Sequence, residues 1–193
     1  MRVFIAVLVL IFSLQSLTKA EDIRDFEIEG MSIGDSLLDY YSKDEIKNKK
    51  FYRKQAGENK KYAIFNLNDS KSYEKVNVGF KDHDSKFKIV VATGYIWFDN
   101  DIKNCLKKKK EIINDLKSIF SNLEIRDDGK QVHEFDNKSY TYATYFMFPG
   151  KFPQNHILVG CYDWSEDLEF VDHLRVGIVT TEYMKWLYEV ADK

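Results

Sequence analysis

The sequence predicts an α+β fold, namely a two-layer sandwich in which an antiparallel sheet of about five strands carries helices packed on one face. Three observations lead to this fold class. Polar and apolar residues alternate in several short segments, whereas in others apolar residues recur every three or four positions. Predicted strands also follow one another across short turns, which favours antiparallel pairing. The predicted order of elements is αα-ββ-α-βββ-α.

The first twenty residues, "MRVFIAVLVLIFSLQSLTKA", have the layout of a secretory signal peptide. Arg2 precedes an apolar run, and the small residue Ala20 ends the segment. The apolar run is shorter than the roughly 20 residues that a helix needs to span a bilayer. We therefore expect cleavage near Ala20 and a periplasmic or secreted address for residues 21–193, which form a single α+β domain. Retention of residues 1–20 as a membrane anchor is the alternative.

Two helix-start patterns follow in residues 32–50. Ser32 with Asp35, and Ser42 with Glu45, have the spacing of a capping box. In that motif a hydroxyl and an acid three residues later satisfy free backbone amides at the start of a helix. The spacing predicts two short helices that meet at Ser42.

An apolar stripe runs along the first of these two predicted helices. It consists of Leu37, Leu38 and Tyr41. We interpret the stripe first as an element of the fold. If Leu37, Leu38 or Tyr41 is exposed to solvent, docking to an envelope partner becomes the better interpretation.

Two strands, preceded by a short candidate strand that the order above does not count, are predicted between Tyr62 and Phe98. "YAIFNL" (residues 62–67) is a short apolar run, and "YEKVNVGFK" alternates apolar with polar residues. "FKIVVATGYIWF" (residues 87–98) follows after the turn "DHDS", so the last two strands form a hairpin. Gly94 marks a bulge or a bend in the latter strand.

The longest predicted helix runs from Asn100 to Phe120. Its apolar stripe faces the sheet and consists of Ile102, Cys105, Leu106, Ile112, Ile113, Leu116 and Phe120. Lys109 also falls on this stripe, where its aliphatic stem can be buried. The run "KKKK" (residues 107–110) wraps around the helix, so it indicates a solvated face rather than a patch for anionic lipid.

Three further strands and a helix complete the predicted fold. A polar loop through residues 127–129 leads to strands at residues 139–148, 156–164 and 173–179. Aromatic residues alternate along the first of these strands, where they either fill the core or line an apolar cavity. The last helix begins at a threonine and carries Met184, Leu187 and Tyr188 on one face, with Trp186 as a further candidate for that face.

The two cysteines, Cys105 and Cys161, are predicted to form a disulfide. An even pair in an oxidising compartment favours a bridge, and the long helix can cover the strand that contains Cys161. The bridge closes a loop for which chain entropy gives about 4 kcal/mol of stabilisation. Two buried free thiols are the alternative. No CxxC motif is present, which disfavours an oxidoreductase.

Charge and missing motifs disfavour several classes of function. The formal net charge is −2 and becomes −4 once Arg2 and Lys19 are removed with the signal peptide, so nucleic acid is an unfavourable partner. GxGxxG, GxxxxGK[ST], HExxH and GxSxG are absent. The four histidines lack metal-ligand spacing; they are His83, His133, His156 and His173. The acidic segment 163–172 lacks the glycine of a calcium loop. We therefore expect no cofactor, no metal and no catalytic residue.

Two segments carry a resemblance to known proteins. "FEIEGMSIGDSLLDYYSKDEI" and "LRVGIVTTEYMKWL", with the single cysteine that opens the lysine-rich helix, are similar to exported hypothetical proteins of marine, Pelagibacter-like alphaproteobacteria. This likeness covers most of the mature chain and implies a periplasmic address. "GMSIGDSLLDY" also resembles the Gly-Met-Ser/Thr helix opening of the small lipoprotein subunit of the outer-membrane barrel-assembly machinery, although the lipidated cysteine of that subunit is missing here.

Three hypotheses for function follow. The first is a non-enzymatic protein-interaction or envelope-associated module. The second is a small apolar-ligand or lipid binder with a pocket of a few hundred Å³ between sheet and helix. The third is a hydrolase with a dispersed site, which needs a histidine within hydrogen-bond reach of an acid and a nucleophile.

Overall fold

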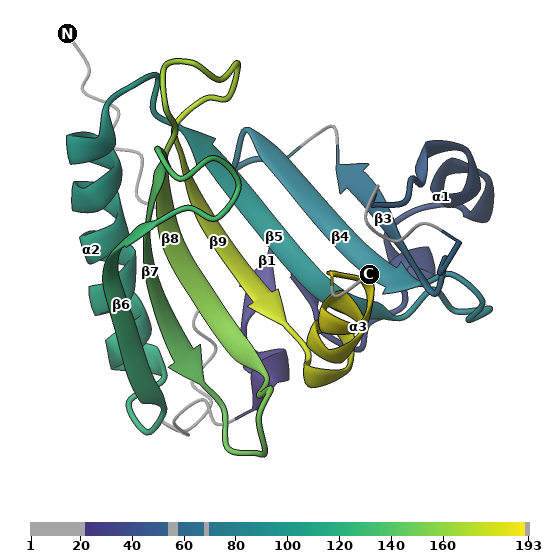
Figure 1. Ribbon diagram of the computed structural model, residues 1–193. Helices are drawn as coiled ribbons and strands as arrows, with labels where there is room; N and C mark the ends of the chain where they lie inside the picture. The colour runs from purple at the N-terminus through teal and green to yellow at the C-terminus, as the bar shows by residue number, and fades with distance from the viewer. Residues whose placement is uncertain (1–21, 54–57, 68–69, 192–193) are drawn as a thin grey trace, which may run out of the picture.

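The structure is a computed structural model that describes residues 22–53, 58–67 and 70–191 (Figure 1). The predicted signal peptide lies outside the described residues. The strands are β1 (Glu27–Ile28), β2 (Met31–Ser32), β3 (Tyr62–Leu67), β4 (Lys75–Lys81), β5 (Ile89–Trp97), β6 (Glu124–Val132), β7 (Tyr140–Met147), β8 (His156–Asp163) and β9 (His173–Val179). The α-helices are α1 (Lys43–Lys49), α2 (Ile102–Ile119) and α3 (Thr181–Ala191).

A seven-stranded antiparallel sheet dominates the fold. Its strand order is β3-β4-β5-β9-β8-β7-β6, and β1 and β2 form a separate two-stranded hairpin. The predicted α+β class with an antiparallel sheet is therefore confirmed. The prediction of about five strands was wrong, because β6 and the short β1–β2 hairpin were not expected.

Strand β6 lies where the sequence predicted a polar loop. It is an edge strand that pairs only with β7, and nearly all of its residues are exposed. An edge strand with solvent on both faces has no alternation of apolar and polar residues to detect. A register shift between Asp127 and Gly129 interrupts the pairing, and the positive φ of Gly129 (63°) suits the glycine there.

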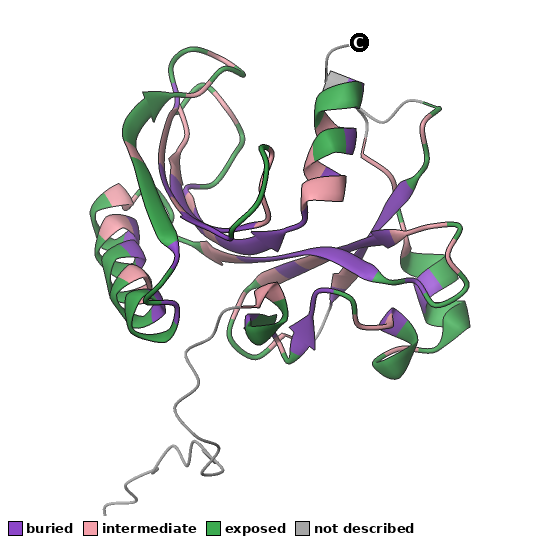
Figure 2. Cartoon of the chain, turned by 90° about the horizontal axis from the view of Figure 1, so that it is seen from below, coloured by how far each residue is buried: buried purple, intermediate pink, exposed green. Residues whose placement is uncertain are grey.

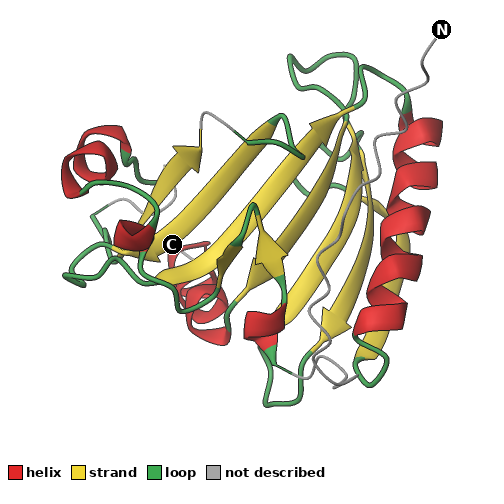
Figure 3. Cartoon of the chain, turned by 180° about the vertical axis from the view of Figure 1, so that it is seen from behind, coloured by secondary structure: helices red, strands yellow, loops and turns green. Residues whose placement is uncertain are grey.

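The helices pack on both faces of the sheet, so the expectation that they share one face was wrong. One face, the α2 face, carries α2, α1 and the β1–β2 hairpin (Figure 3). The opposite face, the α3 face, carries α3, whose Tyr183, Trp186 and Val190 are buried against the sheet. Figure 2 shows that the sheet curls toward the side of α3 at its β6 end. The α3 face is therefore concave.

Helix α2 crosses the α2 face as its apolar stripe predicts. Asp101 caps it by accepting a hydrogen bond from the amide of Asn104, at 3.1 Å. Cys105, Leu116 and Phe120 are buried in the core between helix and sheet.

Cys105 and Cys161 form a disulfide, as predicted, which joins α2 to β8, an inner strand of the sheet. Their Cα atoms are 6.1 Å apart, and 56 positions separate them in the sequence. The described residues contain no free cysteine. The bridge therefore fixes the long helix to this inner strand.

Lys109 lies on the buried stripe of α2, as its position predicts. Its side chain is 9% exposed, and its Nζ lies 3.6 Å from a carboxylate oxygen of Asp127. Burial lowers the pKa of Lys109, although the nearby carboxylate opposes this effect. The ammonium group thus forms an ion pair with an acid of β6 and does not extend into solvent.

Of the two predicted capping boxes, only the second starts an α-helix. Ser42 and Glu45 form both reciprocal hydrogen bonds at the start of α1. Ser32 instead belongs to strand β2, and its amide donates to the Asp35 carboxylate at 2.9 Å in a turn. Gly34, with a φ of 92°, carries the chain through this turn, which a helix cannot accommodate. Residues 37–39 form a 3₁₀ turn.

A buried ion pair ties the end of α1 to the end of β4. The Asp82 carboxylate, 7% exposed, accepts hydrogen bonds from Lys50 and, at 2.6 Å, from the hydroxyl of Tyr52. Burial raises the pKa of Asp82, but the two hydrogen bonds outweigh burial and hold this pKa below its ordinary value. The stabilisation is therefore present above the unfolded-state pKa and is lost as the pH falls through the folded-state pKa.

Asp82→Asn is expected to lower the free energy of unfolding at pH 7 by about 1–3 kcal/mol, because hydrogen bonds to a charged group are lost. Urea unfolding at pH 7 and at lower pH measures this difference between wild type and variant. It should shrink as the pH falls through the folded-state pKa of Asp82, where the carboxylate becomes protonated. Asp115→Asn on the exposed side of α2 is the control and should change stability by less than about 0.5 kcal/mol. A difference for Asp82→Asn that does not vary with pH would contradict this account.

Candidate functional site

Aromatic side chains meet at one end of the sheet on the α3 face. The register aligns Trp97 of β5, His173 of β9 and Tyr162 of β8 in one cross-strand row. The rings of Trp97 and His173 are 5.6 Å apart, and His173 stacks on Tyr162 at 4.8 Å. Antiparallel pairing places these residues together because each lies at the end of its strand.

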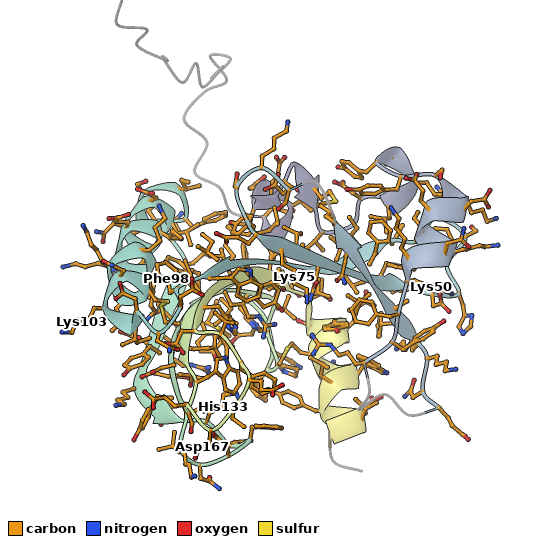
Figure 4. All side chains as sticks on the ribbon, turned by 90° about the horizontal axis from the view of Figure 1, so that it is seen from above. Lys50, Lys75, Phe98, Lys103, His133 and Asp167 are labelled. Carbon is orange, nitrogen blue, oxygen red and sulfur yellow. A yellow bond between two sulfur atoms is a disulfide. The ribbon has the colours of Figure 1, made fainter. Side chains whose placement is uncertain are left out.

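Two loops extend this row into a wall. Trp164 and Phe170 come from the loop between β8 and β9, and their rings lie 4.9 Å apart. His133 and Phe135 come from the loop after β6. The ring of His133 lies 4.7 Å from that of Trp164, and Phe135 contacts Phe170 at 5.8 Å. Figure 4 shows His133 and Asp167 on the side of the sheet that α3 occupies.

These side chains enclose a pocket of about 480 Å³, which we call the aromatic pocket. Its walls are Trp97, His133, Phe135, Trp164, Phe170 and His173, with Asp99, Glu169 and Val171 at its rim. Phe135 and Phe170 are 65% and 50% exposed, and Trp97 is 38% exposed. Large aromatic side chains gathered in the open typically mark a binding surface.

Hydrogen bonds hold the two loops in place. The buried Asp172 carboxylate accepts from the amide of Trp164 at 2.7 Å, and the carbonyl of Asp172 accepts from the amide of Phe98 at 2.8 Å. The Ser139 hydroxyl accepts from the amide of Ser165 at 2.9 Å, which joins one loop to the other. The pocket is therefore formed before any ligand binds.

A second hollow of about 430 Å³ adjoins the aromatic pocket and shares His133 with it. Its other walls include polar groups such as Asp128, Gln131 and Glu134. Its floor contains the small residue Ala143, which leaves space above the sheet. The α3 face thus carries the apolar aromatic pocket and, beside it, a hollow lined by several polar groups.

Arg175 lies in the next cross-strand row, between Tyr95 and the small residue Gly160. Its buried Nε has no hydrogen-bond partner among the described residues. Burial opposes the charge of Arg175, but interactions with Tyr95 and Tyr162 outweigh burial and hold its pKa above the ordinary value. The guanidinium is therefore a permanent positive charge beneath the concave face.

His173 is neutral at neutral pH. Burial lowers its pKa, and the positive charges of Arg175 and Lys75 lower it further, against a backbone hydrogen bond to Val171. The ring therefore serves the aromatic pocket as an uncharged wall.

The structure places the predicted docking residues on the other side of the sheet and does not bring them together on the surface. Leu37 is completely buried, and Tyr41 packs on Phe65 with a ring separation of 4.7 Å. Only Leu38 is exposed, at 38%. The disulfide cysteines also lie in the core of the α2 face, so no predicted site residue lines the aromatic pocket.

The histidines do not form an acid–histidine pair in the described part of the chain. The Nδ1 atoms of His156 and His173 lie 3.0 and 2.9 Å from backbone carbonyls, and that of His133 accepts from a backbone amide at 3.1 Å. Residues 22–53, 58–67 and 70–191 also contain no cluster of acids, histidines and cysteines suited to a metal ion. In the same ranges, no helix combines the length and apolar character needed to cross a membrane.

Comparison of the chain with protein-family models, with curated proteins and with solved structures finds no match. The function is therefore argued from the site alone.

Sequence reasoning missed the aromatic pocket, although a signal for it exists. Tyr95 with Trp97, and Tyr162 with Trp164, make their strands apolar on the face that α2 does not cover. A strand that is apolar on both faces indicates either a second covering layer or a binding surface. Here α3 covers only one end of that face.

Proposed function

We propose that this chain is an exported, non-enzymatic binding protein that holds a small apolar molecule in the aromatic pocket. The observation that carries the proposal is a preformed pocket of about 480 Å³ with six aromatic or imidazole walls. Its volume falls within the usual range of small-molecule sites, which are concave and mostly apolar.

The location of the pocket differs from the expected one. An apolar cavity was expected between sheet and helix, behind the predicted strand at residues 139–148, which contains β7. There Phe146 and Phe148 are buried in the core of the α2 face, and Phe148 packs on Phe120 of the segment that ends α2. The space that suits a ligand is on the opposite face, where α3 and two loops leave the sheet open.

The geometry favours a ligand over a flat protein surface. The walls come from four separate segments: the end of β5, the loop after β6, the β8–β9 loop and the start of β9. They surround a hollow, whereas docking onto a globular partner uses a broad and nearly flat surface. The hypothesis of an envelope-protein interface is supported by the exposed Leu38 alone, since Leu37 is buried and Tyr41 packs on Phe65.

The periplasmic or secreted address is part of the proposal. It is supported by the signal-like layout of residues 1–20 and by the disulfide between Cys105 and Cys161. Disulfides persist in oxidising compartments and are rare where thiols are kept reduced.

A neutral fluorescent naphthylamine probe tests the proposal. The wild-type protein is expected to bind it saturably, with a change in the fluorescence of Trp97 and Trp164. The double variant Phe135→Ala/Phe170→Ala is expected to raise the Kd about tenfold, since each aromatic contact contributes about 0.5–1.5 kcal/mol. Both side chains are exposed, so the variant should keep its stability.

The matched control is Phe51→Ala, the same substitution at an exposed site beside the edge strand β3, at the opposite end of the sheet from β6. It should bind the probe as the wild type does. Equal affinity of the wild type and the double variant, or no saturable binding by the wild type, would refute the proposed function.

A further inference from the structure

The charged side chains that line the aromatic pocket are acids. Among the described residues, the acids that line it are Asp99 and Glu169, and no lysine or arginine does. Both acids are exposed at the rim, and neither has an ion pair or hydrogen bond within the described residues. The pocket therefore presents two unmatched carboxylates beside uncharged rings.

The rings add to this negative character. An aromatic face carries the negative part of the ring quadrupole and attracts cations. Trp97, Trp164, Phe135 and Phe170 provide four such rings within one hollow. The neutral ring of His173 adds no positive charge to oppose them.

The angles between the rings define the shape of the group that fits. Trp97 and His173 meet at 83°, Trp164 and Phe170 at 66°, and His133 and Phe135 at 76°. Rings at such angles form corners, which surround a rounded group.

From charge and shape together, we infer that the aromatic pocket binds the quaternary ammonium group of an organic cation. This inference rests on the proposed function of the same pocket. Such a group is rounded, has an apolar surface of alkyl groups and donates no hydrogen bonds, so it needs no polar partner from the walls. The two rim carboxylates supply long-range attraction that guides the cation to the rings.

Arg175 is the competing charge, because it lies in the row next to Trp97 and His173. It does not line the aromatic pocket, and it faces the floor beside it. Lys75 lies further along that row, opposite Tyr95. If the positive charges of Arg175 and Lys75 determine which ligand charge the pocket prefers, an anionic ligand will bind best. This alternative is one outcome of the test.

Three probes of nearly the same shape separate these cases. They are benzyltrimethylammonium, its neutral isostere neopentylbenzene and the anion benzylsulfonate, each measured by displacement of the naphthylamine probe. The cation is expected to bind about tenfold more tightly than the neutral isostere, as cation–π attraction and the carboxylates both favour it. The preference should weaken at high salt, since the carboxylates are exposed.

The double variant Asp99→Asn/Glu169→Gln tests the role of the two rim carboxylates. It should reduce the ratio between the affinities for the cation and for neopentylbenzene. Asp99 has a φ of 35°, a conformation that asparagine also adopts, so the backbone is preserved. The control is Glu124→Gln/Asp115→Asn, which removes two exposed charges away from the pocket and should change nothing.

The outcomes separate the two proposals. If neopentylbenzene binds as well as the cation, the proposed function stands and the inference of a cation fails. If benzylsulfonate binds best, the inference also fails, and the positive charges of Arg175 and Lys75 decide the preference. If neither the naphthylamine probe nor any of the three compounds binds, both the proposed function and the inference are overturned.

Discussion

Replacing Cys105 and Cys161 together with alanine is expected to lower the free energy of unfolding by about 4 kcal/mol. The bridge spans 56 positions, so removing it restores a large amount of conformational freedom to the unfolded chain. Urea unfolding without reductant measures the loss. Both sulfur atoms are buried, so the alanines also leave small cavities in the core of the α2 face.

Reductant separates the two contributions. Added to the wild type, it should lower stability nearly to that of the double variant, and it should not affect the double variant. Alkylation of the protein from its host should modify the thiols only after reduction, with a mass that fits a chain starting near Glu21. If reductant does not change the stability of the wild type, or if its cysteines are alkylated without reduction, the description of the bridge is incorrect.

Trp186→Ala is expected to lower the free energy of unfolding by about 3–5 kcal/mol. Trp186 is 1% exposed and is the largest side chain that joins α3 to the sheet. Its ring lies 5.1 Å from that of Tyr62 and 5.3 Å from that of Tyr183. Alanine would leave a cavity under the helix that the surrounding rings cannot fill. Thermal or urea unfolding measures the change.

Two control variants make this prediction specific. Trp186→Phe should cost less than about 1.5 kcal/mol, because the ring remains and the indole N–H, which has no partner among the described residues, is removed. Tyr188→Ala, at an exposed position of the same helix, should stay within about 0.5 kcal/mol of the wild type. If Trp186→Ala is as stable as Tyr188→Ala, the described packing of α3 is incorrect.

Much of the sheet could be predicted from the sequence. The ranges 62–67 and 173–179 coincide with β3 and β9, and the predicted strands at 139–148 and 156–164 contain β7 and β8. These strands are buried on one face or on both, so they appear in the sequence as alternating segments or as apolar runs. Strand β6 has no buried face and therefore gave no such signal.

The arrangement of the helices could be predicted only in part. The predicted apolar face of α2 was correct, because seven apolar positions share one face of a long helix. In α3 the buried residues are Tyr183, Trp186 and Val190, whereas Tyr188, expected on the buried face, is exposed. Sequence periodicity shows which face of a helix is apolar, but it does not show which side of the sheet the helix covers.

The candidate site depends on contacts between distant parts of the chain. Trp97 and His173 are neighbours only because β5 pairs with β9 across the long segment that contains α2 and β6–β8. No local pattern predicts that pairing. The outward-facing aromatics at the strand ends were visible in the sequence, but their convergence follows from the strand order alone.

The position of β9 in the sheet has a consequence for the timing of folding. Strands β3–β5 and β6–β8 are two runs of neighbours in sequence, and β9 alone joins them by pairing with β5 on one side and β8 on the other. During synthesis, residues 173–179 emerge after all the strands that they connect. Until then β5 and β8 keep open edges, which are templates for aggregation. The protein therefore completes its sheet late, and a nascent chain that stops before residue 173 would remain as two unjoined halves.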